Sequence, residues 1–248
     1  MTIRTCILLF GCLAGCLLGV DARANIVLGG TRIIYPQGER EVTIALSNKG
    51  SAPALVQSWM DDGAAHSTPE NSSAPFLIMP PITRIEAQAS QTLRILFNGT
   101  PLPTTRESLF WLNVLEIPPV SAEAREKNNL LLAIQSRIKV FYRPASVSGS
   151  LHEAAESLKW AWVKDGAQWQ LRCTNTSPFY VSFAQLSTLK AGQTLVNGDG
   201  TQMVEPGGEI IFKLTPAAHS IAGLKEGQVR FEYINDYGAL KQVDALVQ

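Results

Sequence analysis

The chain has 248 residues, enough for one large domain or two domains of ordinary size. Its apolar fraction of 46% allows a packed core and argues against a disordered chain. Lys plus Arg and Asp plus Glu number 21 each, so the sequence lacks the basic excess that nucleic-acid partners usually require. We therefore expect a folded protein without a nucleic-acid partner.

The beginning of the chain, residues 1–24, is predicted to be a cleavable secretory signal. Arg4 supplies a basic start, an apolar run extends from Cys6 to Val20, and Ala22-Arg23-Ala24 fits the small-x-small pattern before a cleavage site. The run is shorter than the roughly 20 residues of a membrane-spanning helix, and no second long run follows, so we expect no stable membrane insertion. Leu13-Ala14-Gly15-Cys16 also resembles a lipobox, which leaves lipidation of Cys16 as an alternative.

Removal of the signal leaves one cysteine. Three of the four cysteines lie in residues 1–24, and only Cys173 remains in the mature chain. A single cysteine cannot form an internal disulfide, so stability must come from core packing. We interpret Cys173 as a small buried hydrophobic residue in a strand.

Short segments that alternate apolar and polar residues between turn residues dominate the mature sequence. Such segments are typical of strands in a β-sandwich. The first set comprises 41–48, 54–60, 91–97, 109–114 and 130–142, and the second comprises 158–163, 169–175, 180–189, 209–214, 228–234 and 240–247. The small and polar stretch from Pro144 to Ser150 lies between the sets. We predict an all-β protein with two immunoglobulin-like β-sandwich domains, residues 25–144 and 145–248, each of a size suited to that fold.

An enzymatic function is not indicated. The three histidines, His66, His152 and His219, are scattered over polar or loop-like stretches. The sequence contains no H-x-x-x-H, C-x-x-C, G-x-S-x-G or P-loop pattern. We expect a protein that is not an enzyme and that needs neither a cofactor nor a metal.

Four segments resemble the periplasmic pilus chaperones of the PapD-like family. They are R-E-S-L-F-W-L-N-V-L-E-I-P-P at 106–119, I-Q-S-R-I-K-V-F-Y-R-P at 134–144, Y-I-N-D-Y-G at 233–238, and Thr31-Arg32. Their order and spacing cover nearly the whole mature chain. The resemblance implies two sandwich domains joined at an angle, like a boomerang, with a cleft between them. It also implies a periplasmic chaperone that holds pilus or fimbrial subunits and delivers them to an outer-membrane usher.

The segment that begins near Asn128 carries the donor-strand prediction. Leu130, Leu132 and Ile134 alternate, so they share one face of an extended strand. From the pattern alone, an ordinary core strand is the favoured interpretation, and donation of the strand is the alternative. In the family, the corresponding strand is donated to a subunit that lacks a strand of its own, in donor-strand complementation. Because an exposed apolar edge promotes aggregation, we expect the subunit-free protein to cover it by self-association or by folding of a loop.

Five charged residues acquire roles through the resemblance. Arg32 and Lys139 match the cleft residues that grip the C-terminal carboxylate of the subunit, which suits a bidentate guanidinium and a compact ammonium. Glu107, Arg143 and Asp236 match a charged network between the domains that fixes their angle. Without the resemblance, each of the five would be interpreted as a solvated surface charge.

Two other functions fit the sequence. The first is a secreted two-domain binding module, such as an adhesin, which would need no carboxylate grip. The second is a chaperone of the same family whose subunits form a surface layer other than a pilus. The sequence does not identify the subunit or the usher.

Overall fold

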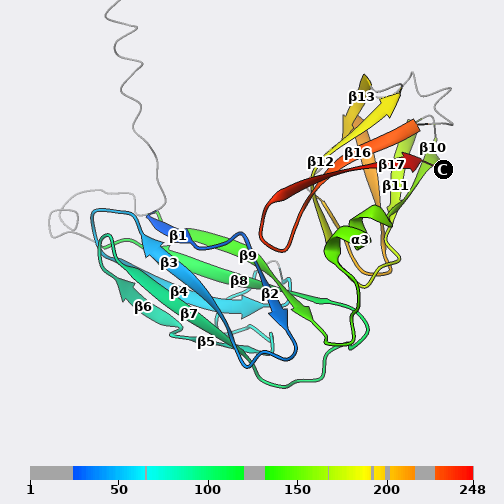
Figure 1. Cartoon of the computed structure of the whole chain (residues 1–248). Helices are drawn as coiled ribbons and strands as arrows, with labels where there is room; N and C mark the ends of the chain where they lie inside the picture. The colour runs from blue at the N-terminus through cyan, green and yellow to red at the C-terminus, as the bar shows by residue number, and fades with distance from the viewer. Residues whose placement is uncertain are drawn as a thin grey trace, which may run out of the picture.

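The computed structural model describes residues 25–64, 66–119, 132–166, 168–190, 193–198, 202–215 and 227–247. The predicted signal, residues 1–24, lies outside this part of the chain. Two β-sheet domains meet at an angle in Figure 1, with the N-terminal domain in blue to green and the C-terminal domain in green to red. The predicted all-β fold class with two sandwich-like domains is confirmed.

The N-terminal domain consists of two sheets. A four-stranded sheet has the order β1 (Ile26–Leu28), β3 (Val42–Asn48), β7 (Ser90–Phe97) and β5 (Phe76–Met79). A five-stranded sheet has the order β2 (Arg32–Pro36), β9 (Ile134–Arg143), β8 (Ser108–Ile117), β4 (Ala54–Asp61) and β6 (Ile82–Ile85). Only the β2–β9 pair is parallel, and every other pair in these two sheets is antiparallel. β1 and β2 follow each other in the chain but belong to different sheets, so the segment of residues 26–36 links both layers.

The N-terminal core forms where the alternating faces of the two sheets meet. Leu46, Leu93 and Ile95 of the first sheet and Leu112 and Val140 of the second are fully buried. Their neighbours in sequence point to the opposite face of each sheet, as the period of two in a strand requires. The connection between β5 and β6 turns at Pro80-Pro81, and the Met79–Pro80 peptide bond is cis.

The C-terminal domain opens with the short helix α3 (Leu151–Glu156) and continues with strands. Its strands are β10 (Lys159–Asp165), β11 (Gln168–Thr174), β12 (Val181–Lys190), β13 (Gln193–Gly198), β14 (Met203–Val204), β15 (Glu209–Thr215), β16 (Gly227–Ile234) and β17 (Leu240–Val247). The sheet order is β13-β15-β11-β10-β17-β16-β12-β14, and β13 also pairs with β12. The pairing therefore wraps around a core in which Trp160 contacts Phe183, Phe212 and Phe231.

Cys173 lies in this core. Its side chain is fully buried on β11, and burial raises the pKa of its thiol to about 12. A thiol in such a setting stays protonated and unreactive at neutral pH. The interpretation of Cys173 as a small buried hydrophobic residue is confirmed.

The sequence patterns located the long strands and missed the short ones. All eleven predicted segments contain an observed strand, with ends that differ by a few residues. β1, β5, β6 and β14 have two to four residues each, too few for alternation to be recognised. β2 is buried at Arg32, Ile33 and Tyr35, so its two faces are both covered and no alternation arises. α3 has six residues and depends on a capping box between Ser150 and Glu153 rather than on helical periodicity.

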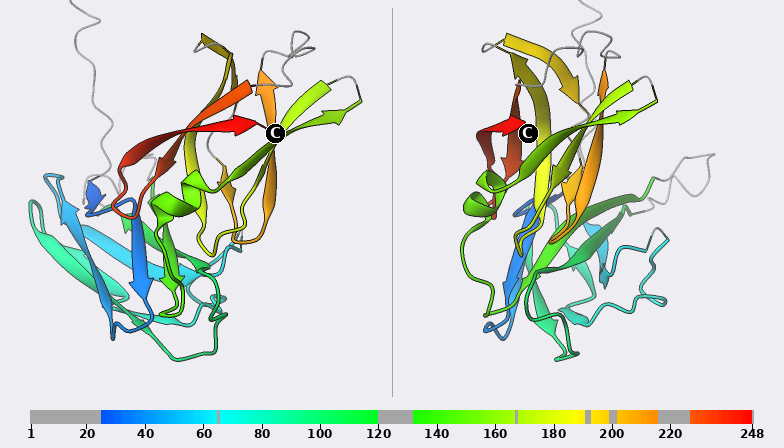
Figure 2. Two further views of the ribbon diagram at one scale, coloured as in Figure 1. Left: turned by 45° about the vertical axis from the view of Figure 1, so that its right-hand side comes forward. Right: turned by 90° about the vertical axis from the view of Figure 1, so that its right-hand side faces the viewer.

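The two domains contact each other through the hairpin of β16 and β17, through Glu107 just before β8, and through Arg143 at the end of β9. Figure 2 shows from two further sides that the tip of this hairpin, in red, reaches the N-terminal domain beside β2. A backbone hydrogen bond joins Glu107 N to Pro178 O at 3.0 Å and adds a direct link between the domains.

Candidate functional site

Arg32 and Lys139 lie side by side. Arg32 is the first residue of β2, and the parallel pairing of β2 with β9 places it in register with Lys139. Residues in register on neighbouring strands project from the same face of a sheet. Phe141, two positions after Lys139, packs against Tyr180 of the C-terminal domain, so this face points into the junction. The structure thus brings together the two cations that the sequence could only suggest separately.

The C-terminal domain supplies polar partners for both cations. Arg32 Nη1 donates to the Ile234 carbonyl oxygen at 2.8 Å, and Lys139 Nζ donates to Ser182 Oγ at 3.0 Å. Arg32 is only 8% exposed, and its Nε is buried with no hydrogen-bond partner among the described residues. A buried charged donor without an acceptor is costly, so this cluster retains capacity to bind an anion.

The lowered pKa values of Arg32 and Lys139 also indicate that the pair would be stabilised by an anion. Burial lowers the pKa of Arg32, although the charges of Asp236 and Glu107 oppose this effect. Burial, and then the charge of Arg32, lower the pKa of Lys139 to about 8. In the part of the chain that the structure describes, neither cation forms a salt bridge with a carboxylate. An arriving carboxylate would relieve the repulsion between the two charges.

The three residues of the interdomain network also lie together. Arg143 Nε donates to Glu107 Oε1 at 2.8 Å, while Nη1 and Nη2 donate to Asp236 at 2.8 and 2.9 Å. Glu107 is buried, and its second oxygen accepts the backbone N–H of Tyr180 at 2.9 Å. Burial raises the pKa of the Glu107 carboxyl, and the charge of Arg143 opposes that rise. One guanidinium on β9 therefore holds carboxylates from both domains.

The N-terminal part of β9 has one unpaired edge. β8 pairs with β9 from Ile134 to Tyr142, whereas β2 pairs with it only from Lys139 onward. Among the described residues, no strand occupies the β2-side edge of β9 before Lys139. Leu132 and Ile134 are 66% and 43% exposed there, on the face that continues into the buried Val140. Leu130, the third residue of the predicted donor set, lies outside the described residues.

A second polar cluster, which the sequence did not reveal, lies on the junction-facing side of β9. Arg137 forms a salt bridge with the buried Asp61, whose other oxygen accepts from Asn113 Nδ2, and Gln135 donates to Asn113. Burial raises the pKa of Asp61, but its bonds to Arg137, Asn113 and the Gly63 amide outweigh this and leave the pKa lowered. The available signal was the alternation of Gln135, Arg137 and Lys139, which places all three on one face of β9.

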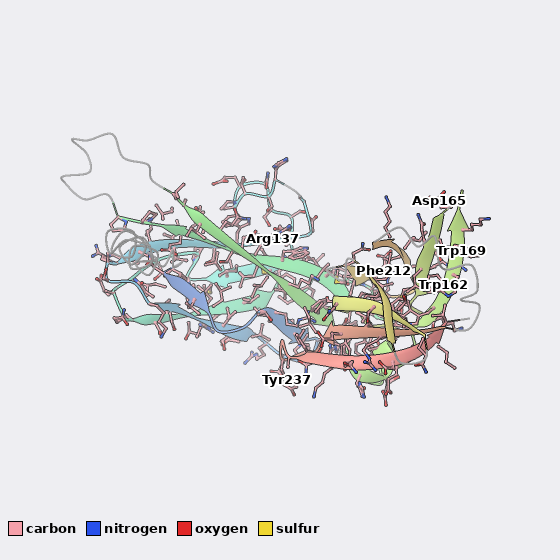
Figure 3. All side chains as sticks on the ribbon, turned by 90° about the horizontal axis from the view of Figure 1, so that it is seen from above. Arg137, Trp162, Asp165, Trp169, Phe212 and Tyr237 are labelled. Carbon is pink, nitrogen blue, oxygen red and sulfur yellow. The ribbon has the colours of Figure 1, made fainter. Side chains whose placement is uncertain are left out.

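Arg137 also stacks on an aromatic ring. Its guanidinium carbon lies 4.5 Å from the ring centre of Trp111 on β8, and Lys139 Nζ lies 5.8 Å from the same ring. Figure 3, which views the molecule from above, labels Arg137 on the N-terminal domain. The cluster borders a cavity of about 300 Å³ under the connection that contains His66 and Thr68. The contacts within this polar cluster fix the orientation of Gln135 and Arg137, the side chains next to Lys139 on the same face of β9.

Family models match both halves of the chain. Residues 25–148 match the N-terminal domain of PapD, a pili and flagellar-assembly chaperone, and residues 153–245 match the C-terminal domain of the pili assembly chaperone PapD. The chain belongs to the PapD-like family of pilus-assembly chaperones. The resemblance seen in the sequence is thereby confirmed, and the chain is a fimbrial or pilus assembly chaperone.

Individual relatives of the PapD-like family are similar to this chain over most of their length. The chain is 38% identical to the chaperone protein FimB/FhaD of Bordetella pertussis over 93% of this chain and 91% of that protein. It is 39% identical to the probable fimbrial chaperone YadV of Escherichia coli over 87% of both proteins. The crystal structure of YadV superposes with a TM-score of 0.74 and covers 90% of this chain and 100% of that chain.

One similar solved structure contains a subunit. It is the Salmonella enterica SafA pilin in complex with the SafB chaperone, with a TM-score of 0.73, 29% identity, and coverage of 92% of this chain and 98% of the matched chain. PapD-like chaperones are not enzymes by function. In the described part of this chain, no helix is long and apolar enough to cross a membrane.

Replacement of Arg143 tests the interdomain network. Arg143→Ala leaves Glu107 buried without its cation, so we expect the free energy of unfolding in urea to fall by about 3 kcal/mol. Arg230→Ala is the matched control, because it removes an exposed bidentate pair with Asp244 and should cost only about 0.2–1 kcal/mol. Small-angle scattering of Arg143→Ala should also show a wider range of domain angles. Equal losses in the two variants, with unchanged scattering, would contradict the role of the network.

Proposed function

We propose that this chain is a periplasmic chaperone that completes fimbrial subunits by donor-strand complementation and anchors their C-terminal carboxylate. The observation that carries the proposal is the position of the cation pair. Arg32 and Lys139 lie where the unpaired edge of β9 ends and β2 begins. A strand added to that edge would therefore run directly toward two buried positive charges.

The position of the charges sets the direction of the added strand. A strand that places its terminal carboxylate at Lys139 and extends back toward Leu132 runs in the same direction as β9. β2 already pairs with β9 in parallel, so the partner strand would continue the line of β2 on the same edge. A chain has one terminal carboxylate, so this contact fixes the register of the whole pairing.

The donated side chains supply the apolar part of the affinity. Leu132 and Ile134 are exposed in the free chaperone and would fill a groove in the subunit, as would Leu130 by its place in the sequence. Each such side chain contributes about 1.5–3 kcal/mol when fully buried, before the cost of ordering is subtracted. Backbone hydrogen bonds along β9 give affinity for any strand, and the side chains select the groove.

The cellular setting follows from the family and from the start of the sequence. We propose that residues 1–24 are removed during secretion, that domains of residues 25–144 and 145–248 remain, and that the protein works in the periplasm. It would pass its subunits to an outer-membrane usher. The exposed Leu132 and Ile134 also support self-association, or coverage by a loop, in the subunit-free chaperone.

Loss of both cleft cations is the first test. The chaperone is co-expressed in the periplasm with the fimbrial subunits encoded beside it, and the co-purified subunit is quantified. Arg32→Ala with Lys139→Ala should lose the subunit almost completely, because no charge remains to hold the carboxylate. Lys159→Ala with Arg230→Ala is the control, since it removes two cations from the outside of the C-terminal domain and should bind like wild type. Retention of the subunit by the cleft variant would refute the carboxylate anchor.

Substitution of the donor residues tests the strand itself. Leu132→Asp with Ile134→Asp places charges in the groove of the subunit, so we expect little or no co-purified subunit. The melting temperature of the free chaperone should hardly change, because both side chains are exposed. Ile211→Asp with Leu246→Asp, which are 45% and 72% exposed in the C-terminal domain, should bind normally. Equal binding by both pairs of variants would rule out donation by β9.

The lowered pKa of Lys139 predicts that subunit binding depends on pH. Below the pKa of about 8, the ammonium is charged before the carboxylate arrives, and affinity is at its maximum. Above it, Lys139 must take up a proton on binding, so affinity should fall by up to about tenfold per pH unit until the higher pKa of the complex is reached. Lys139→Arg stays charged and should show a flat profile between about pH 7 and 9.5. The same slope in wild type and Lys139→Arg would exclude Lys139 as its source.

A further inference from the structure

Tyr237 is a rigidly presented aromatic residue at the tip of the β16–β17 hairpin. Its side chain is 95% exposed, the highest value among the large hydrophobic residues that the structure describes. The turn beneath it is fixed, since Asn235 Oδ1 accepts the backbone N–H groups of Tyr237 and Ala239 at 3.0 and 2.9 Å. Gly238 N also donates to the Asn235 carbonyl at 3.0 Å. An ordered turn therefore holds an aromatic ring in solvent.

Three residues around Tyr237, namely Ile234, Asp236 and Gly238, are held against the N-terminal domain. The Ile234 carbonyl accepts from Arg32, and Asp236 binds Arg143. Gly238 has a φ of +81°, and a Cβ atom there would lie 2.6 Å from Thr31 Oγ1, so its backbone packs directly on the residue before Arg32. The side chain of Tyr237 instead projects into solvent, as Figure 3 shows at the boundary between the domains.

This position coincides with the end of the proposed partner strand. The strand would terminate at Arg32, in front of the beginning of β2, and Thr31 precedes that point. The hairpin tip packs on Thr31, so the last residues of the partner must pass beside the tip. We propose that the ring of Tyr237 packs on the C-terminal residues of the bound fimbrial subunit and forms a contact from the C-terminal domain. This inference rests on the proposed function and extends it to a third side chain at the carboxylate site.

The chemistry of tyrosine suits this role. A tyrosine has few rotatable bonds and a large ring, so it gains contact area at a low entropic cost, and tyrosines are enriched among the strongest residues of interfaces. Its turn is already ordered in the free chaperone, which reduces that cost further. Arg32 is already only 8% exposed, and exclusion of water strengthens the attraction between its guanidinium and a carboxylate beside which the ring would pack.

Site-specific photo-crosslinking tests the contact directly. The amino acid p-benzoylphenylalanine replaces Tyr237 in the full chaperone, which is co-expressed with the fimbrial subunits encoded beside it and irradiated. We expect a crosslink to a peptide within about the last ten residues of the subunit, as judged by mass spectrometry, because that segment pairs with β9 at roughly 3.3 Å per residue. The same probe at Leu246, which is 72% exposed on β17, serves as the control and should give no such crosslink.

A binding measurement gives the size of the effect. Tyr237→Ala should weaken subunit binding by about tenfold without a change in the melting temperature of the free chaperone, and Tyr237→Phe should retain most of the affinity. Tyr237 also lines a cavity of about 410 Å³ with His152, Tyr233 and Lys241. His152→Ala alters that cavity without changing Arg32, Lys139 or Tyr237 and should bind like wild type.

The outcomes distinguish a failure of the Tyr237 contact from a failure of the proposed chaperone function. If the complex forms and the probe at position 237 labels only another part of the subunit, another protein or nothing, the inference is wrong while the chaperone function stands. If His152→Ala weakens binding as much as Tyr237→Ala, the cavity and not the ring is responsible, which also overturns the inference. If wild type binds no subunit, the proposed function itself fails.

Discussion

Two like charges held in register dominate the physical chemistry of the domain junction. The parallel pairing of β2 with β9 places Arg32 beside Lys139, and burial removes much of the water that would screen them. The Ile234 carbonyl and the Ser182 hydroxyl offset part of this cost, but neither carries a negative charge. The two neutral acceptors keep the cations in place. Neither positive charge is neutralised by a carboxylate of the described residues, so the pair favours a bound anion. The fold holds this arrangement because the domains cannot separate without removing those neutral acceptors.

β9 fixes the position of the cation pair relative to other residues along the same strand. The same strand carries the exposed Ile134 at its beginning, two residues after the exposed Leu132, with Lys139 in the middle and Arg143 at its end. A strand rises roughly 3.3 Å per residue, so the distances between Ile134, Lys139 and Arg143 along β9 are set by backbone geometry alone. Arg143 in turn holds Asp236 on the hairpin that contacts Arg32. Residues of β9 thus hold both the C-terminal domain, through Arg143, and the cation pair, through Lys139.

Local patterns predicted the long strands and could not predict the site. Alternation reveals a strand when one face is buried and the other is solvated, which holds for β3 and β7. It fails for β2, because one face packs in the core and the other lies against the second domain, so Arg32 came only from the resemblance. The proximity of Arg32 and Lys139 depends on a pairing between strands far apart in the sequence. The predicted strand 54–60 stops just before Asp61, although Asp61 is the buried end of β4 and the partner of Arg137.

The polar cluster on β9 explains how a half-paired strand stays ordered. Beyond Lys139 the strand has neighbours on both edges, but from Ile134 to Ile138 it has only β8. Over that stretch, Gln135 is bonded to Asn113, and Arg137 is bonded to Asp61 and stacked on Trp111. These contacts hold the strand extended while its other edge and its apolar side chains remain available. Under the proposed function, a partner would meet a strand that is already in its binding conformation, and the entropy of ordering β9 would not reduce the affinity.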